Sequence, residues 1–167
     1  MIAKEQLLNS IIHECNVCKH LFTKIPADKF EYRPQENMRS TLELLRYLTF
    51  APYEFAMAMV KDAIENKNWK SYIEAEGKSE AIKAEEFPKA MDEQIEKFKI
   101  MFGQITDEDF LNKNVTPTWE PNKKLGAVLM DVALKVVVAY RMQLFLYVKL
   151  NGANVNTANC WSGIDWN

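Results

Sequence analysis

The spacing of helix-breaking residues is the feature of this sequence that most constrains its fold. Only 5 glycines and 6 prolines occur in 167 residues, and almost all of them lie between four long segments or near the ends of those segments. Glycine and proline are the residues that a helix interior tolerates worst. The four segments therefore predict helices over residues 3–23, 40–65, 87–104 and 124–151.

Local signals support the ends of these predicted helices. Pro26 disfavours a helical residue before it, which ends the first segment. Ser40 and Glu43 form a capping-box pattern, in which each side chain can bond to the other residue's backbone amide. Pro88 suits the first helical position of the third segment. Gly152 is a typical residue just beyond the end of a helix.

The remaining parts of the chain read as connections. Residues 66–86 are polar and predict a loop with some local helix, whereas Pro52 predicts a kink inside the second helix. Four helices of this length with one long connection are typical of a four-helix bundle. We therefore predict an all-α four-helix bundle that forms a single domain over residues 1–167.

Composition excludes several functional classes. The 48% hydrophobic content argues against disorder. Lys and Arg total 21 against 23 Asp and Glu, so the chain lacks the basic excess typical of nucleic-acid or anionic-membrane binding. No run reaches the roughly 18 apolar residues of a membrane span. Three cysteines, an odd number, without a signal-peptide pattern favour reduced thiols and a cytoplasmic location.

Two histidines and two cysteines of the first predicted helix, at positions 13, 15, 18 and 20, look like a zinc ligand set. Helical geometry argues against this interpretation, because one helix cannot wrap all four side chains around a tetrahedral metal. The cysteines instead fall on an apolar stripe, and the histidines fall roughly opposite it. The predicted stripe consists of Leu8, Ile11, Ile12, Cys15, Cys18 and Phe22. We interpret His13 and His20 as surface residues.

Two other stretches resemble a known family. Residues 21–34 read LFTKIPADKFEYRP and residues 38–48 read MRSTLELLRYL, and together they resemble the opening of the DinB/YfiT-like superfamily. Residues 139–152, AYRMQLFLYVKLNG, resemble the last helix of that family. The resemblance covers nearly the whole chain. It implies a four-helix bundle of the DinB-like type, with an unusual crossing order.

The same resemblance implies a divalent metal held by three histidines, with thiol-dependent transferase, isomerase or hydrolase activity. The family's first histidine position matches Tyr47, and the other two match Val136 and Tyr140. Valine has no donor atom, and a neutral phenol is a poor ligand for zinc or nickel beside imidazole. We therefore expect the metal site to be lost, with no metal and no cofactor.

The residues around the former metal position predict a cavity between the second and fourth helices. Glu54 lies two turns after Tyr47 and is expected to share its face. The predicted lining consists of Tyr47, Glu54, Val136, Tyr140 and Gln143. Three interpretations remain open: the tyrosines fill the space and bond to each other or to Glu54, the cavity binds a small molecule, or Glu54 or Tyr140 carries out acid–base catalysis.

These alternatives lead to competing functions. The first hypothesis is a metal-free DinB-like bundle that binds a small ligand or partner in the inter-helix cavity. The alternative is a metal-dependent hydrolase or thiol-dependent transferase that uses non-standard ligands such as Glu54. A third possibility is a purely structural or oligomerisation module. Whether the chain is an enzyme stays open at the level of sequence.

The second predicted helix is apolar on nearly all sides, which is more than one bundle core needs. We expect a homodimer to cover the surplus, because twofold pairing is the commonest assembly of soluble proteins. The aromatic tail with Trp161 and Trp166 could instead cover it within one chain.

Overall fold

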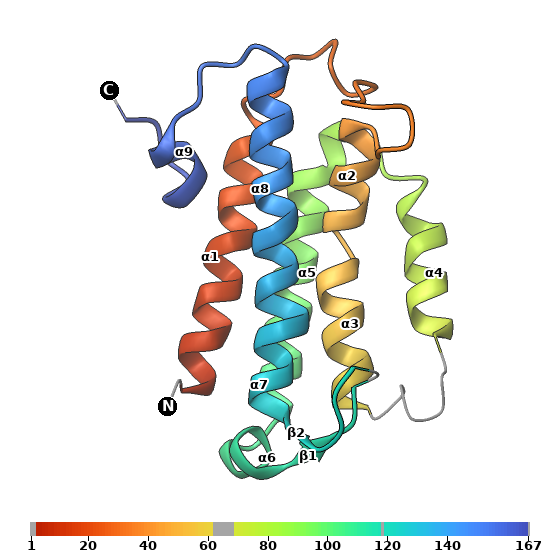
Figure 1. The fold of residues 1–167 in the computed structure, drawn as a ribbon, viewed down its shortest axis with the longest axis vertical. Coiled ribbons are helices and arrows are strands. Elements are labelled where there is room, and N and C mark those ends of the chain that lie inside the picture. Colours follow the sequence, from red (N-terminus) through yellow and green to blue (C-terminus); the bar gives the residue numbers. More distant parts are fainter. Residues whose placement is uncertain (1–2, 62–68, 118, 167) are drawn as a thin grey trace.

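The computed structural model describes residues 3–61, 69–117 and 119–166 of the chain. Four helical segments run alongside one another down the long axis of the molecule (Figure 1). In chain order they are α1 (Lys4–Phe22), α2 (Thr41–Leu48) with α3 (Ala51–Val60), α5 (Phe87–Gln104), and finally α7 (Leu125–Leu129), a π-helical turn (Met130–Leu134) and α8 (Lys135–Leu150). The predicted all-α four-helix bundle is confirmed.

Shorter elements connect and flank the bundle. They are α4 (Lys70–Ser79), a 3-10 turn (Ala84–Glu86), α6 (Asp107–Asn112), β1 (Asn114–Val115), β2 (Lys123–Lys124) and α9 (Thr157–Trp161). The two strands pair antiparallel, with Asn114 opposite Lys124. Within the described ranges, no helix has the length and apolar character needed to cross a membrane.

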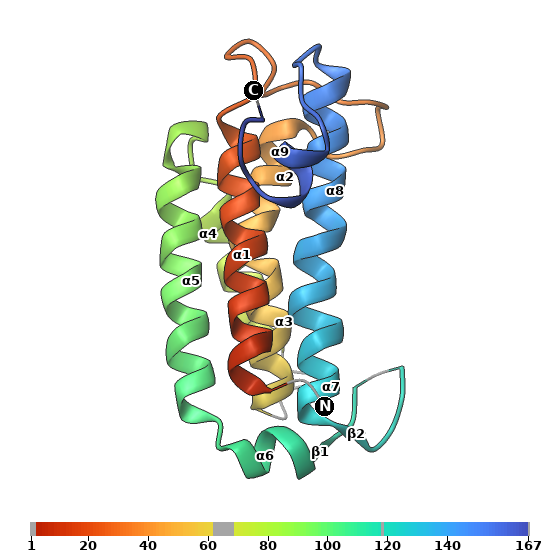
Figure 2. The same ribbon diagram turned by 90° about the vertical axis from the view of Figure 1, so that its left-hand side faces the viewer.

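The four segments are not arranged in sequential order around the bundle. α1 packs against α5 and α8, and the α2–α3 segment packs against those same two neighbours. The first and second segments therefore occupy diagonal corners, as the two perpendicular views show (Figures 1 and 2). This arrangement confirms the unusual crossing order that the family resemblance implied.

The cap of α2 forms as the sequence predicts. The Ser40 hydroxyl accepts a hydrogen bond from the Glu43 backbone N–H at 3.2 Å, and the Ser40 N–H donates to the Glu43 carboxylate at 2.8 Å. The Arg33 guanidinium also donates two hydrogen bonds to that carboxylate, with N–O distances of 2.6 and 2.7 Å. Because both carboxylate oxygens of Glu43 accept hydrogen bonds from these partners, the side chain has a structural role at the start of α2.

The second predicted helix is broken where we expected only a kink. α2 ends at Leu48 and α3 begins at Ala51, and Phe50 between them has φ −134° and ψ −41°. Pro52 lies in the first turn of α3, where its missing N–H costs no helical hydrogen bond. The predicted end at residue 65 falls outside the described residues.

Residues 70–79 form a helix within the stretch that we predicted as a loop with some local helix. The aromatic rings of Trp69 and Tyr72 contact Phe55 of α3, with ring centroids 6.2 and 5.2 Å apart. α4 thus covers part of the outer face of the α2–α3 segment. It accounts for some of the surplus apolar surface that motivated the homodimer, which stays a prediction. The aromatic tail does not cover that surface, because α9 contacts α1 and α8 instead.

The apolar stripe of α1 is rotated slightly from the predicted one. Leu8, Ile12 and Phe22 are only half-buried, whereas the residue before each of them is fully buried. The buried positions are Leu7, Ile11, Glu14, Cys15, Val17, Cys18 and Leu21. The rotation has a physical reason, because α1 packs between two helices, α5 and α8, and a tail segment also contacts it.

Candidate functional site

Three tyrosines from three different helices meet on one side of the bundle. Tyr47 on α2 and Tyr140 on α8 pack with ring centroids 4.6 Å apart. Tyr72 on α4 reaches the same place, with the Phe50 ring 5.3 Å from its own and 5.6 Å from that of Tyr47. We call Tyr47, Tyr72 and Tyr140 the tyrosine cluster. Sequence reasoning correctly paired Tyr47 with Tyr140.

The hydroxyl of Tyr47 is the centre of the cluster. The ring is 9% exposed, and burial is the main cause that raises the pKa of Tyr47, followed by its hydrogen bond with Tyr140. Burial also raises the pKa of Tyr72, whereas its hydrogen bond with Tyr47 lowers it. Tyr47 and Tyr72 therefore stay neutral at physiological pH and present hydroxyl groups rather than phenolates.

A fixed positive charge stands beside the cluster. The guanidinium carbon of Arg39 lies 4.0 Å from the ring centroid of Tyr47 and 5.9 Å from that of Tyr140. The backbone of Arg39 is held as well, because its carbonyl accepts a hydrogen bond from the Tyr147 hydroxyl at 3.0 Å. Gln143 donates to that hydroxyl at 3.0 Å. Gln143 thus supports the position of Arg39 through Tyr147.

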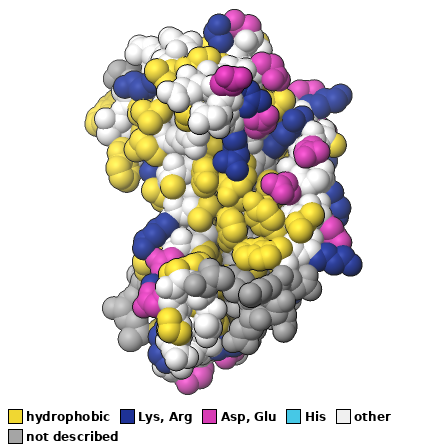
Figure 3. Space-filling view, turned by 45° about the vertical axis from the view of Figure 1, so that its right-hand side comes forward, with side chains coloured by type: hydrophobic (Ala, Val, Ile, Leu, Met, Phe, Trp, Pro, Cys, Tyr) yellow, Lys and Arg dark blue, Asp and Glu magenta, His cyan; other side chains and the backbone are white. Residues whose placement is uncertain are grey.

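A pocket of about 530 Å³ opens next to the cluster. Tyr47 and Phe50 supply its aromatic lining, and the other lining side chains are polar or charged. Its full lining is Arg39, Glu43, Arg46, Tyr47, Phe50, Glu76, Ser79 and Glu80. The space-filling view of this side shows a continuous apolar patch bordered by basic and acidic side chains (Figure 3). The volume lies within the range of about 300–1,000 Å³ found for small-molecule sites, whereas the lining is more strongly charged than that of most such sites.

Glu54, which we expected to share the face of Tyr47, lies in a different place. It is buried, accepts a hydrogen bond from the Ser71 hydroxyl at 2.7 Å, and lines a second hollow of about 340 Å³. That hollow shares only Phe50 and Ser79 with the lining of the first. The break between α2 and α3 is the physical reason, because it interrupts the continuous helix on which the two-turn spacing depended.

Val136 also faces a separate hollow. It lines a space of about 480 Å³ with Phe55, Trp119 and Val132, next to Asp131 and Lys135. Val136 lies one turn before Tyr140 on α8, yet it does not line the pocket beside Tyr47. Of the five predicted lining residues, the structure therefore joins Tyr47 and Tyr140 directly and Gln143 through Tyr147.

The residues present do not fit the divalent metal that the fold family implies. At the three matching positions the donors are two phenols and an apolar valine. The raised pKa of Tyr47 disfavours the phenolate that a metal would need. The Arg39 charge at the same place would repel a cation. Within the described part of the chain, no group of three or more His, Cys, Asp or Glu side chains is placed to hold a metal ion.

The sequence interpretation predicted only Tyr47 among the residues that line the pocket, and it missed Tyr72 and Arg39 beside Tyr47. Tyr72 belongs to the stretch that we predicted as a loop with some local helix, and its spacing from Trp69 is that of one helical turn. Arg39 belongs to the stretch that resembles the family, but nothing in its sequence context indicated that its guanidinium would lie over an aromatic ring. The aromatic spacing could have indicated α4, whereas the position of Arg39 required the fold.

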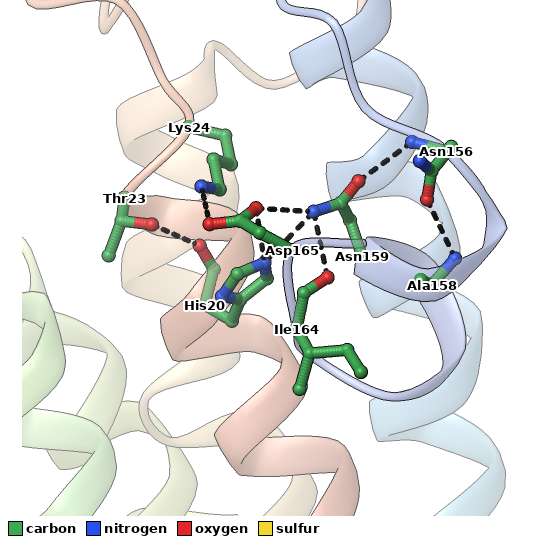
Figure 4. A network of polar contacts seen from close by, with 8 residues as sticks. All are labelled: His20, Thr23, Lys24, Asn156, Ala158, Asn159, Ile164 and Asp165. Carbon is green, nitrogen blue, oxygen red and sulfur yellow. Dashed lines mark hydrogen bonds and ion pairs between the residues drawn. The ribbon is translucent and has the colours of Figure 1, made fainter. Parts of the chain in front are cut away.

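The histidines of α1 hold the C-terminal tail rather than a metal. The amide nitrogen of Asn159 lies 3.1 Å from the His20 Nε2 atom and 2.9 Å from the Asp165 carboxylate (Figure 4). Lys24 pairs with that carboxylate at 2.7 Å, and the His13 ring contacts the Trp161 carbonyl oxygen at 2.8 Å. His13 is exposed as predicted, but His20 is half-buried beneath the tail.

The three cysteines are buried and unbridged. Burial raises the pKa of Cys15 to about 12 and that of Cys18 well above its usual range. Thiols in such surroundings are poor nucleophiles and poor metal ligands. The prediction of Cys15 and Cys18 as core residues is confirmed.

Comparison with solved structures identifies the architecture. A DinB-like protein of Bacillus subtilis, YjoA, matches with a TM-score of 0.66 over 90% of this chain and 94% of its own length. The fold is DinB-like. The two sequences are 20% identical, so the similarity extends to the fold alone. No family model matches the sequence, and no curated protein matches it significantly.

Proposed function

We propose that this DinB-like bundle has lost the three-histidine metal site and binds a small molecule in the pocket beside the tyrosine cluster. The observation that carries the proposal is the convergence of Tyr47, Tyr72 and Tyr140 beside the Arg39 guanidinium. Of these four residues, Tyr47 and Arg39 line a pocket of about 530 Å³. Phenol hydroxyls offer hydrogen bonds, aromatic rings offer a stacking surface, and Arg39 is available for a polar group.

The arrangement supports binding more than it supports chemistry by a metal. Glu54 was the strongest candidate for a replacement ligand, but its carboxylate is bonded to Ser71 and lines a different hollow. A ligand in the pocket would contact residues of α2 and α4 together, since both elements contribute to its lining. Binding would therefore stabilise the packing of α4 on the bundle.

Ligand-observed NMR with small aromatic probes tests the binding. Phenol, benzoate and benzylamine at millimolar concentration should show saturation transfer from the wild-type protein, and the Tyr47→Ala, Phe50→Ala double variant should lose it. Met142→Ala, on the exposed face of α8, is the matched control and should behave as wild type. Equal transfer in all three proteins, or none in the wild type, would exclude this pocket.

Metal analysis tests the lost centre separately. Protein purified without an affinity tag should contain well under one equivalent of zinc, nickel or iron per chain, because the matching positions offer no imidazole. Stoichiometric metal that survives dialysis and disappears in the Glu54→Ala variant would support the alternative hydrolase or transferase and overturn the proposal.

A further inference from the structure

The pocket beside the tyrosine cluster has two walls of opposite charge. Arg39 and Arg46 belong to the α2 side, whereas Glu76 and Glu80 belong to α4 and its C-terminal end. Among the described residues, neither arginine is ion-paired with either glutamate, although all four line the same space. Opposite charges that face a common cavity without pairing leave both walls available to a ligand.

The arginines are positioned before any ligand arrives. The Arg46 Nε atom donates to the Ile82 carbonyl oxygen at 2.8 Å, which fixes the guanidinium and leaves its terminal nitrogens for other partners. Arg39 is held over the Tyr47 ring at 4.0 Å. Positioning of this kind lowers the entropy cost of binding, because the side chains are already ordered.

The remaining carboxylate of the lining does not take part. Glu43 is bonded to both terminal nitrogens of Arg33 and to the Ser40 N–H, so its charge is already compensated. The free charges of the pocket are therefore two positive and two negative groups. A ligand with a single charge would leave one of the two walls without a partner.

We propose that the pocket binds a small zwitterion, a molecule with one carboxylate, one ammonium group and an aromatic body, such as an aromatic amino acid or a dipeptide that contains one. The carboxylate would bind Arg39 and Arg46, the ammonium group would bind Glu76 and Glu80, and the ring would pack on Tyr47 and Phe50. This inference rests on the proposed function and specifies its ligand class.

Calorimetric titration with matched probes tests the ligand class. L-phenylalanine and the dipeptide Gly-Phe carry both charges, whereas 3-phenylpropanoate lacks the ammonium group and 2-phenylethylamine lacks the carboxylate. At least one zwitterion should bind about tenfold or more tighter than both single-charge analogues, because each lost charge-assisted contact weakens binding by that order. Equally tight binding of either analogue, or no binding of either zwitterion, would overturn the inference.

Charge variants assign the two walls. Arg39→Ala should weaken the zwitterion about tenfold and leave 2-phenylethylamine unchanged, whereas the Glu76→Gln, Glu80→Gln double variant should weaken the zwitterion and leave 3-phenylpropanoate unchanged. Lys99→Ala removes one positive charge, as Arg39→Ala does, and Glu108→Gln removes one negative charge. Both positions are exposed and lie outside the pocket lining, so neither control variant should have an effect. Zwitterion binding that is insensitive to both pocket variants would refute the assignment.

Failure of the zwitterion inference can be distinguished from failure of the proposed binding pocket. Phenol carries no charge at neutral pH, so its binding reports the aromatic lining alone. If phenol still binds in a Tyr47-dependent manner while neither zwitterion binds, the pocket stands and the ligand class is wrong. If phenol also fails to bind, the pocket itself is wrong.

Discussion

Tyr140 and Arg141 are consecutive residues of α8, yet they belong to opposite regions of the molecule. Arg141 points to the side where α8 meets α1 and α9, and it is 1% exposed. Its Nε atom lies 2.5 Å from the Glu14 carboxylate, an ionic contact rather than a well-directed hydrogen bond. Its terminal nitrogen donates to the Cys160 carbonyl oxygen at 2.7 Å. Tyr140 points instead to the side of α2, where its ring packs against that of Tyr47.

The two regions use arginine in different ways. On the tail side, the arginine charge is buried and matched by a carboxylate, which makes it a structural link between α1, α8 and the tail. On the pocket side, Arg39 and Arg46 form no ion pair with a carboxylate among the described residues, although the Arg39 charge acts on Glu43, and both arginines line a cavity. A compensated buried charge indicates a structural role, whereas uncompensated charges around a cavity indicate a place for a ligand.

The largest loss of unfolding free energy should come from a substitution at Arg141, on the tail side. Arg141→Met keeps a similar volume but leaves the Glu14 carboxylate buried without its partner. Breaking a buried ion pair in this way costs about 3–5 kcal/mol of unfolding free energy. Urea denaturation followed by circular dichroism would measure the loss.

A double variant separates the pair from the packing. Replacing both partners, as Glu14→Leu with Arg141→Met, should recover most of the loss, because no unpaired charge then remains. A single Arg141→Met variant within about 1 kcal/mol of the wild type, which is the usual range of an exposed ion pair, would show that this link is not structural.

A smaller loss of unfolding free energy is expected from a substitution at Arg39, on the pocket side. Arg39→Ala removes the contact with the Tyr47 ring but retains the backbone carbonyl to which Tyr147 donates. Loss of a cation–π contact at an exposed site costs about 1 kcal/mol or less. The same denaturation experiment without ligand should show this. A loss above about 2 kcal/mol, typical of a buried structural group, would make Arg39 a residue of the scaffold and weaken the contrast.

The fold was largely predictable because its main signals are local. Pro88 and Gly152 delimit α5 and α8 to within one residue of the predicted ends, and the Ser40/Glu43 box marks the start of α2. These signals act within one helical turn, so the sequence alone contains them. The break at Phe50 depends on packing against other elements, whereas the helix over residues 70–79 had only the weak local signal of the Trp69 and Tyr72 spacing.

The candidate site was less predictable because it depends on where distant residues meet. The spacing of Tyr47 and Glu54 predicted a shared face, but the break between α2 and α3 separates them into different hollows. Gly152, by contrast, was predictable from its residue type alone. Its φ of +87° is a backbone conformation that glycine adopts without strain, so no distant contact is needed to expect it. Tyr72 and Arg39 came to the site only through the packing of α4 and the connection before α2.

The smallest effect in this comparison should be a dependence of stability on pH through His20. Burial is the main cause that lowers the pKa of His20; the Asp165 charge opposes this and the Lys24 charge adds to it. The unfolded chain, where the pKa is near 6.5, then binds a proton more readily than the folded one. The unfolding free energy contributed by His20 is therefore present above pH 6.5 and is lost as the pH falls below it.

The structure supplies the local reason. The amide of Asn159 donates to the His20 Nε2 atom, which can accept only while that nitrogen is unprotonated. The Lys24 ion pair is the main cause that lowers the pKa of Asp165, so this carboxylate stays ionised across the same range and does not produce the slope. His20→Asn should flatten the decline in unfolding free energy between pH 7 and 5, measured by urea denaturation, whereas His13→Asn should retain it. If His20→Asn declines as steeply as the wild type, the pH response arises elsewhere, and the tail side holds its polar contacts independently of histidine charge.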